Sequence, residues 1–286
     1  MVYRASKSPP GQAGEKINMK LSKRLELVVF FATRVSGPLR IADVGTDHGY
    51  VPIAAARRDP GARCIAMDVR PGPLERAREH IREYGLEDRI QTRLSDGVEN
   101  LEAGEADTVV IAGMGGELVI HILEGGRRLW QSVERWILSP QSELYKVRRY
   151  LEANGFVIAD EEMVEEDSKY YTVMEAVRRD QGLGGSSDAR QGEENDLVRA
   201  GYYYGPRLIE KRSPALMEFL QKEEELLTHI LAGVEGQGSP KALERQKELR
   251  ERLRLIRAAG DRMAGDLEAK DNQNGRRGEG QYDEVR

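Results

Sequence analysis

The stretch Ile41-Ala42-Asp43-Val44-Gly45-Thr46-Asp47-His48-Gly49-Tyr50 decides the fold class. Its apolar start predicts a strand over 41–44, and the residues after it predict a helix over 50–58. The turn between them has glycine at position 45, where the missing Cβ lets a ligand approach the backbone closely. Open α/β sheets bind ligands at the carboxyl ends of their strands, which is where this turn would lie. The stretch therefore predicts the first strand, loop and helix of a ligand-binding α/β domain.

Strands and helices alternate beyond this stretch. Further strands are predicted over 64–69, 90–94, 108–112 and 136–138, and further helices over 73–84, 116–124 and 142–154. Each strand is short and apolar, as expected when helices cover both faces of a sheet. The alternation predicts a parallel sheet with right-handed crossovers.

The pattern then changes to two strands, predicted over 156–164 and 170–177, with only a short acidic turn between them. No crossover helix fits in that turn, so the two strands must be antiparallel. A nicotinamide dehydrogenase would more often continue with another helix. The predicted fold is therefore a Rossmann-like class I methyltransferase domain, with a mostly parallel seven-stranded sheet and a reversed terminal strand.

The remaining segments divide the chain. We expect a flexible leader over 1–18, the α/β domain over 19–180, a flexible Gly/Ser-rich linker over 181–205, a helical hairpin over 206–265 and a disordered tail over 266–286. Ser213-Pro214 and Ser239-Pro240 open the two hairpin helices, because serine caps a helix and proline is tolerated in its first turn. Apolar residues at helical spacing predict an antiparallel, coiled-coil-like pair.

Composition limits the functional classes. The chain has 286 residues, a net charge of −5 and one cysteine, Cys64, which excludes an intrachain disulfide and a site built on several thiolates. No run approaches the roughly 18 apolar residues of a membrane span, and no apolar signal segment opens the chain. We expect a cytoplasmic protein without a metal or a membrane. The acidic balance counts mildly against a large RNA footprint, but Lys241–Arg257 holds seven basic residues against three acids and could form a local phosphate-binding patch.

The first loop favours one cofactor over another. It lacks G-x-G-x-x-G, the glycine density that a dinucleotide's diphosphate needs. Its acidic character suits the cationic sulfonium of S-adenosylmethionine, so Asp43, Gly45 and Gly49 are candidate cofactor-binding residues; a tight structural turn is the alternative.

Later strand ends supply further candidates. Asp68, about 20 residues after the glycine turn, is placed to bind two ribose hydroxyls in either cofactor. Asp96 and Gly97 follow the third strand, where Asp96 could accept a hydrogen bond from the adenine amine or simply cap a helix. The fourth strand ends in Ala112-Gly113-Met114-Gly115-Gly116, a bare backbone wall. We assign Ala112 and Gly113 to the cofactor, and Met114, Gly115 and Gly116 to the substrate.

Several segments together resemble the bacterial tRNA (adenine-22, N1)-methyltransferase family, TrmK. They are Leu21–Leu25, Ala42–Tyr50, Ile111–Gly116, Leu138–Gln141, and Gly205-Pro206 with Pro214 and Phe219-Leu220 beyond. The resemblance runs from about Met19 to about Met263 and implies a catalytic domain, a helical domain that helps to hold tRNA, and S-adenosylmethionine as cofactor. It favours Lys23 and Arg24 as substrate-binding residues. Lys241, Arg245 and Arg252 would contact tRNA, although any one of them could be an ordinary solvated charge.

The implied reaction mainly requires the adenine base to be positioned against the methyl group of the cofactor. N1 of neutral adenine has a free lone pair and can attack the sulfonium methyl without first losing a proton. Asp47 would stabilise the developing positive charge, and His48 and Tyr50 would hydrogen-bond to the base or stack on it. The base would have to be extruded from the folded tRNA. We expect a monomer rather than a homo-oligomer.

Three alternatives stay open. The chain could methylate another RNA base or a small molecule, it could be a noncatalytic RNA-binding protein that kept the fold, or it could be a nicotinamide oxidoreductase. An intact Asp43, Gly45 and Asp68 weigh against the second, and the missing G-x-G-x-x-G weighs against the third.

Overall fold

The computed structural model describes residues 19–179 and 195–265. The strands are β1 (Arg40–Val44), β2 (Arg63–Asp68), β3 (Ile90–Leu94), β4 (Thr108–Ala112), β5 (Arg135–Ser139), β6 (Phe156–Glu166) and β7 (Lys169–Arg178). The helices are α1 (Lys23–Thr33), α2 (Tyr50–Arg58), α3 (Pro71–Glu83), α4 (Gly116–Gly125), the 3-10 turn η1 (Arg127–Leu129), α5 (Leu144–Ala153), α6 (Asp196–Tyr204), α7 (Pro206–Glu210), α8 (Pro214–Val234) and α9 (Pro240–Ala264). The predicted strands and crossover helices are all present, with ends shifted by a few residues at most.

All seven strands belong to one sheet, in the order β3-β2-β1-β4-β5-β7-β6. Strands β1 to β5 are parallel, and β7 runs antiparallel to both of its neighbours. This confirms the predicted class I methyltransferase sheet. The reversed strand is the last along the chain but lies between β5 and β6, so β6 forms the edge.

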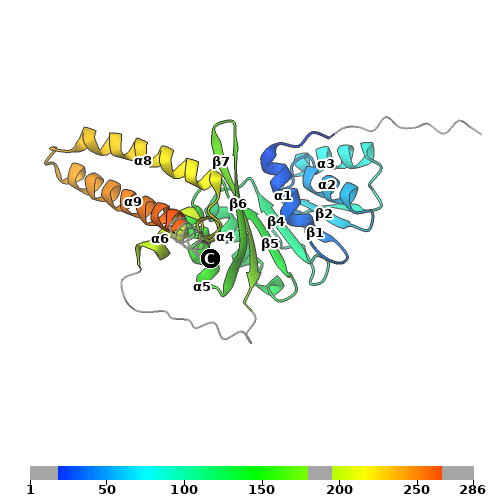
Figure 1. The fold of residues 1–286 in the computed structure, drawn as a ribbon. Coiled ribbons are helices and arrows are strands. Elements are labelled where there is room, and N and C mark those ends of the chain that lie inside the picture. Colours follow the sequence, from blue (N-terminus) through cyan, green and yellow to red (C-terminus); the bar gives the residue numbers. More distant parts are fainter. Residues whose placement is uncertain (1–18, 180–194, 266–286) are drawn as a thin grey trace, which may run out of the picture.

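Helices cover both faces of the sheet (Figure 1). Successive strand residues point to opposite faces, so Ile41 packs with α1, α2 and α3, whereas Ala42 and Val44 pack with α4 and α5. Both faces are apolar because both are covered.

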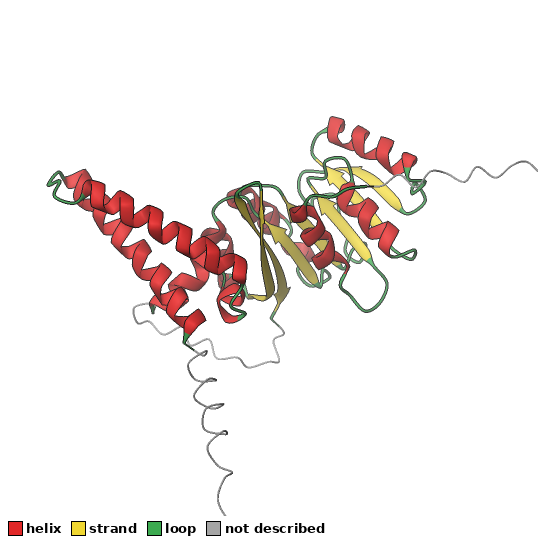
Figure 2. Ribbon diagram, turned by 45° about the horizontal axis from the view of Figure 1, so that its top comes forward, coloured by secondary structure: helices red, strands yellow, loops and turns green. Residues whose placement is uncertain are grey.

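The C-terminal helices have a core of their own. Helices α8 and α9 pack side by side and project from the sheet as a helical arm (Figure 2). Ser213 and Ser239 cap them through their side chains, as predicted. On α9, Leu249, Leu253 and Ile256 are buried, whereas Leu243 is exposed.

Two sequence-based boundaries need correction. Residues 196–204, assigned to the flexible linker over 181–205, form α6, whose N-terminus is capped by the side chain of Asn195. The helix predicted over 142–154 starts at Leu144 instead of Ser142, after Glu143, which has a left-handed backbone. Positions 181–194, with the predicted leader over 1–18 and tail over 266–286, lie outside the described residues.

A buried ion pair joins the sheet to the C-terminal helices. Arg148 of α5 donates to Glu161 of β6 at 2.8 Å, and Arg148 also donates to the carbonyl of Tyr202 in α6 at 2.9 Å. Gly205 follows with φ +100°, and a Cβ there would lie 2.8 Å from a Glu161 carboxylate oxygen. The joint therefore requires glycine at this position. Among the described residues, no helix is long and apolar enough to cross a membrane.

Candidate active site

The predicted site residues gather at the carboxyl edge of the sheet, which is the side where β1 to β5 end and not the edge strand β6. Because these strands are parallel, the loops that follow them share this edge. The turn between β6 and β7 lies there too, and the backbone N–H of Lys23 at the start of α1 donates to Glu166 at 2.7 Å. Nζ of Lys23 donates to the carbonyl of Glu165 at 3.2 Å, so this side chain holds the β6–β7 turn.

The β1 and β4 loops touch each other. The backbone N–H groups of Gly45 and Thr46 both donate to the carbonyl of Met67 at 2.8 Å, which fixes the turn against β2. Gly45 has φ +75°, and a Cβ on it would lie 1.9 Å from Cε of Met114. A side chain at position 45 would have to displace the Met114 methyl group, and the positive φ would strain the backbone of any residue other than glycine.

Two acids lie at the carboxyl ends of the first two strands: Asp43 is next to last in β1, and Asp68 is last in β2. Asp43 is 6% exposed and Asp68 is 7% exposed. Burial raises the pKa of Asp43 to about 6; the nearby charge of Asp68 adds to the rise, and the Thr46 hydroxyl opposes it. One Asp68 oxygen accepts the backbone N–H of Arg70 at 2.7 Å. A cationic or hydroxyl-bearing ligand would stabilise both carboxylates in their charged form.

Three rings gather around the turn before α2. His48, Tyr50 and His80 have ring centroids 5.2 to 5.5 Å apart and interplanar angles of 10° to 20°. Nδ1 of His80 donates to the carbonyl of His48 at 3.0 Å. His48 has φ +65°, a conformation uncommon for a residue with a side chain. We call these three side chains the ring cluster.

Helix α3 holds the rest of that turn. Arg76 donates to Asp47 at 2.7 Å, and Nε2 of His48 lies 3.6 Å from the other Asp47 oxygen. Ala77 packs beneath Gly49, and a Cβ on Gly49 would lie 3.3 Å from the Cβ of Ala77. Asp47 is thus exposed at the edge but already paired with a cation.

The β4 loop faces the start of α1. Gly113 has φ +82°, and a Cβ on it would lie 3.5 Å from Nη1 of Arg24 and 3.9 Å from the Gln141 side-chain amide. The Arg24 guanidinium lies 5.2 Å from the ring centroid of Tyr171 in β7. Arg24, predicted from the resemblance, is therefore beside the wall that Ala112 and Gly113 form.

The neighbouring glycines have packing roles. A Cβ on Gly116 would lie 2.6 Å from the carbonyl oxygen of Ser142, and one on Gly115 would lie 3.2 Å from the Ser142 hydroxyl. Likewise, Gly97 has φ +52° and a Cβ there would lie 3.1 Å from Ile122 of α4. Close packing thus accounts for these glycines without a ligand.

Buried polar atoms at this edge lack partners. Nη1 of Arg24 and Nδ1 of His48 accept or donate no hydrogen bond among residues 19–179 and 195–265. Buried polar groups are normally satisfied, so a polar ligand lying over the β1 and β4 loops would complete these two. This arrangement fits a small amphoteric ligand such as S-adenosylmethionine.

Apolar side chains border the position expected for an adenine ring. Val69 and Leu94 follow or end neighbouring strands and are 56% and 53% exposed, close to the exposed Asp96. Sequence reasoning missed this pair, although exposed apolar residues at adjacent strand ends are the signal that could have found it.

It also missed Arg76, His80 and Gln141. Arg76 and His80 are four residues apart on α3, and only the fold brings that helix to the β1 turn. Gln141 follows β5 and ends the segment Leu138–Gln141 of the family resemblance, so that segment was an available signal.

The three basic residues predicted on α9 differ in their surroundings. Lys241 and Arg245 are exposed, and Arg245 pairs with Glu248 at 3.0 Å. Arg252 instead donates to Glu223 of α8 at 3.1 Å and lies 4.2 Å from the ring centroid of Tyr203. These contacts give Arg252 a packing role within the helical domain.

Comparisons with known proteins agree with this geometry. A family model described as tRNA (adenine(22)-N(1))-methyltransferase, TrmK, matches residues 41–258. The chain is 34% identical over 249 residues to the Bacillus subtilis tRNA (adenine(22)-N(1))-methyltransferase, covering 85% of this chain and 98% of that one. The crystal structure of B. subtilis TrmK superposes with a TM-score of 0.71 at 30% identity, over 85% of this chain and 99% of that one. A Streptococcus pneumoniae relative solved with S-adenosyl-L-methionine gives a TM-score of 0.68 at 30% identity, over 84% and 99%.

Proposed function

The chain belongs to the TrmK family of tRNA (adenine(22)-N(1))-methyltransferases and is an S-adenosylmethionine-dependent enzyme, and we propose how its residues carry out that reaction. The observation that carries the proposal is the set of groups that lie together at the carboxyl ends of the strands. They are two buried acids, the ring cluster, and buried polar atoms without a partner among the described residues. The substrate is tRNA, and we propose that the enzyme acts in the cytoplasm, where tRNA is used.

The cofactor would lie across the β1, β2 and β3 loops. Asp68 would accept hydrogen bonds from the ribose hydroxyls, while Asp96, Val69 and Leu94 would border the adenine. Asp43 would favour the positive charge of the methionine part, and the exposed backbone of Gly45 and Gly113 would let the ligand approach. When bound, S-adenosylmethionine supplies an electrophilic methyl group on its sulfonium.

The target base needs orientation more than proton removal. N1 of neutral adenine has a lone pair in the ring plane, so no residue has to act as a general base. His48 and Tyr50 would stack against the base or hydrogen-bond to it and hold it at the strand edge. Asp47 would stabilise the positive charge that develops on the ring, because a carboxylate aimed at a growing charge lowers the barrier. Arg76 holds Asp47 in place at 2.7 Å.

The helical arm begins close to this site. Phe219 of α8 packs edge-on against Tyr170 of β7, with ring centroids 5.2 Å apart, and Lys222 donates to the Tyr170 hydroxyl at 2.9 Å. Tyr170 is beside the β6–β7 turn at the same sheet edge. A tRNA whose extruded base enters the site could therefore also lie along the arm, where Lys241 and Arg245 would contact its phosphates.

The direct test is transfer of labelled methyl from S-adenosylmethionine to a full-length tRNA transcript, beside the same transcript with guanine at position 22. We expect label on the first transcript alone, recovered as 1-methyladenosine. Equal label on both transcripts would contradict the target position, and label on neither would contradict the activity.

A further inference from the structure

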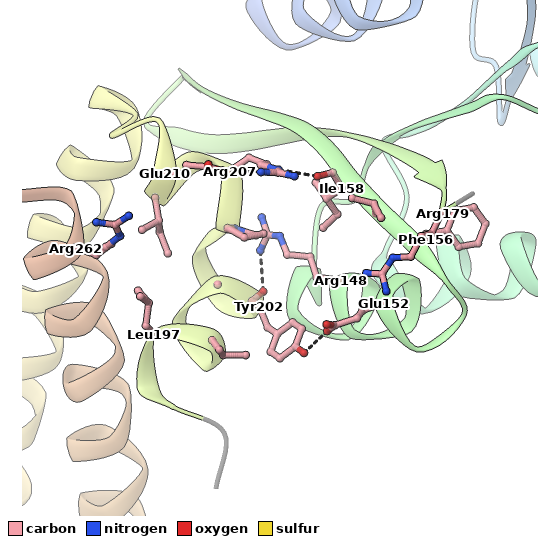
Figure 3. A pocket seen from close by; sticks show the side chains of 15 residues that line it. Arg148, Glu152, Phe156, Ile158, Arg179, Leu197, Tyr202, Arg207, Glu210 and Arg262 are labelled. Carbon is pink, nitrogen blue, oxygen red and sulfur yellow. Dashed lines mark hydrogen bonds and ion pairs between the residues drawn. The ribbon is translucent and has the colours of Figure 1, made fainter. Parts of the chain in front are cut away.

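A cavity lies away from the methyl-transfer site. It has a volume of about 450 Å³, which is within the range of small-molecule sites. Its walls come from α5 and the start of β6 on one side and from α6, α7 and α9 on the other (Figure 3). Because β6 runs parallel to β5, residues 156–158 are at the opposite edge of the sheet from the glycine loops.

The floor of this cavity is apolar. Phe156, Ile158 and Ile209 line it together with Leu197 and Val198 of α6. Val198 is 49% exposed, so part of this apolar lining is in contact with water. A ligand with an apolar body would remove this surface from water.

The polar lining is dominated by arginine. Arg148, Arg179, Arg207 and Arg262 line the cavity, against Glu152 and Glu210. Both acids are already engaged, since Glu152 accepts the Tyr202 hydroxyl and Glu210 accepts Arg207 at 2.7 Å. The acids therefore offer little to a cationic ligand.

Two arginine side chains keep donors that none of the described residues accepts from. The Arg148 side chain is 1% exposed, yet its Nη2 has no hydrogen-bond partner in the described part of the chain. Arg179, the residue after β7, makes no ion pair within residues 19–179 and 195–265. A buried unsatisfied guanidinium nitrogen is costly, and an anionic acceptor would offset that cost through a charge-assisted hydrogen bond.

We propose that this interdomain cavity is a binding site for a small amphipathic anion, a molecule with an apolar body and a carboxylate, sulfonate or phosphate group. The apolar part contacts the floor, and the anionic group faces Arg148 and Arg179. Such a ligand contacts both the sheet domain and the C-terminal helices, so it stabilises the arrangement in which the two are packed together.

The test uses 1-anilinonaphthalene-8-sulfonate as the anionic probe and N-phenyl-1-naphthylamine, which lacks the sulfonate, as the neutral one. Both are titrated by fluorescence into the full chain saturated with S-adenosylhomocysteine, so that the cofactor site cannot take the probe. We expect one saturable site for the anionic probe. Val198→Trp should fill the cavity and abolish binding, whereas Leu243→Trp, at an exposed position of α9, should leave it unchanged.

Arg179→Gln tests the charge without filling the cavity. We expect it to weaken the anionic probe about tenfold and the neutral probe hardly at all. Thermal unfolding of each variant shows whether it is folded. Absence of a saturable site, binding that survives Val198→Trp, or equal effects of Arg179→Gln on both probes would overturn the proposal.

Discussion

At the scale of single residues, Asp43 links cofactor binding to pH. Its carboxyl is buried, and its pKa is raised from 3.8 to about 6 in the free protein, mainly by burial. The protonated acid is thus the form that folding favours; its contribution to stability is complete below about pH 4 and is lost as the pH rises through 6. A bound cation favours the opposite, charged form.

Binding of S-adenosylmethionine should therefore release a proton near pH 6. We expect affinity to rise between pH 5 and 7, by at most about tenfold per pH unit, and then to level off. Titration calorimetry in buffers of different ionisation enthalpy measures both the affinity and the proton release. Asp43→Asn should flatten the pH dependence; an unchanged pH dependence in that variant would show that another group is responsible.

Asp47 should matter for turnover rather than for the cofactor. It is exposed at the sheet edge, and its contacts are with Arg76 and His48. We expect Asp47→Ala to lower kcat by about 100-fold, the size of effect seen when one charge-stabilising group is lost, with little change in the Kd of S-adenosylhomocysteine. Single-turnover kinetics and calorimetry separate the two quantities. Equal losses in both would remove Asp47 from the chemical step.

His80 should position the ring cluster without contacting the reacting atoms. It contributes a stacked ring and one hydrogen bond to the His48 carbonyl. His80→Phe keeps the ring and His80→Gln keeps a donor, so each should lower kcat several-fold and leave cofactor binding intact. His80→Ala should lower kcat further, and an alanine variant with wild-type kcat would contradict the positioning role.

At the scale of elements, the contact between α4 and α5 depends on Gly116. A Cβ there would meet the Ser142 carbonyl oxygen at 2.6 Å and Val147 Cγ2 at 3.0 Å. We expect Gly116→Ala to lower the free energy of unfolding by about 1–3 kcal/mol, the usual cost of overpacking. Urea denaturation measures this quantity.

Gly125, at the other end of the same helix, provides the matched control. A Cβ on it would meet nothing within 4 Å. Because alanine restricts the unfolded chain more than glycine does, Gly125→Ala should be neutral or stabilise by up to about 1 kcal/mol. Equal effects of the two substitutions would mean that the α4–α5 contact is looser than described.

The same elements show what the sequence could and could not predict. Apolar runs that end at Val44, Asp68 and Ala112 marked strands correctly, because helices cover both faces of the sheet. Helix α6 was missed because it has only nine residues and follows a Gly/Ser-rich segment. The close packing of Gly116 against Ser142 and Val147 was not predicted, because a sequence does not show which neighbour a missing Cβ would meet. The contacts of Arg76 and His80 with the β1 turn needed the positions of α3 and β1 in space.

At the scale of the whole molecule, the helical arm extends the site outward. Helix α8 has 21 residues and is thus about 30 Å long. Its start packs on the β6–β7 hairpin beside the active site, while the arm projects away from the sheet (Figures 1 and 2). The buried Arg148–Glu161 pair fixes the joint at its base. A rigid arm would let one tRNA contact both the site and the hairpin helices.

The arm's charges should accordingly divide into two kinds. Lys241 and Arg245 are exposed near the start of α9, so Lys241→Glu with Arg245→Glu should raise the KM for tRNA about tenfold and reduce its salt dependence, because phosphate contacts release counterions. Cofactor affinity and the Tm should not change.

Arg252→Met should instead lower the Tm, because it removes the contacts with Glu223 and Tyr203. Filter binding over a range of salt and thermal unfolding distinguish the two. If the glutamate variant bound tRNA normally, the arm would not carry the phosphate contacts, and recognition would have to reside around Arg24 and the sheet edge.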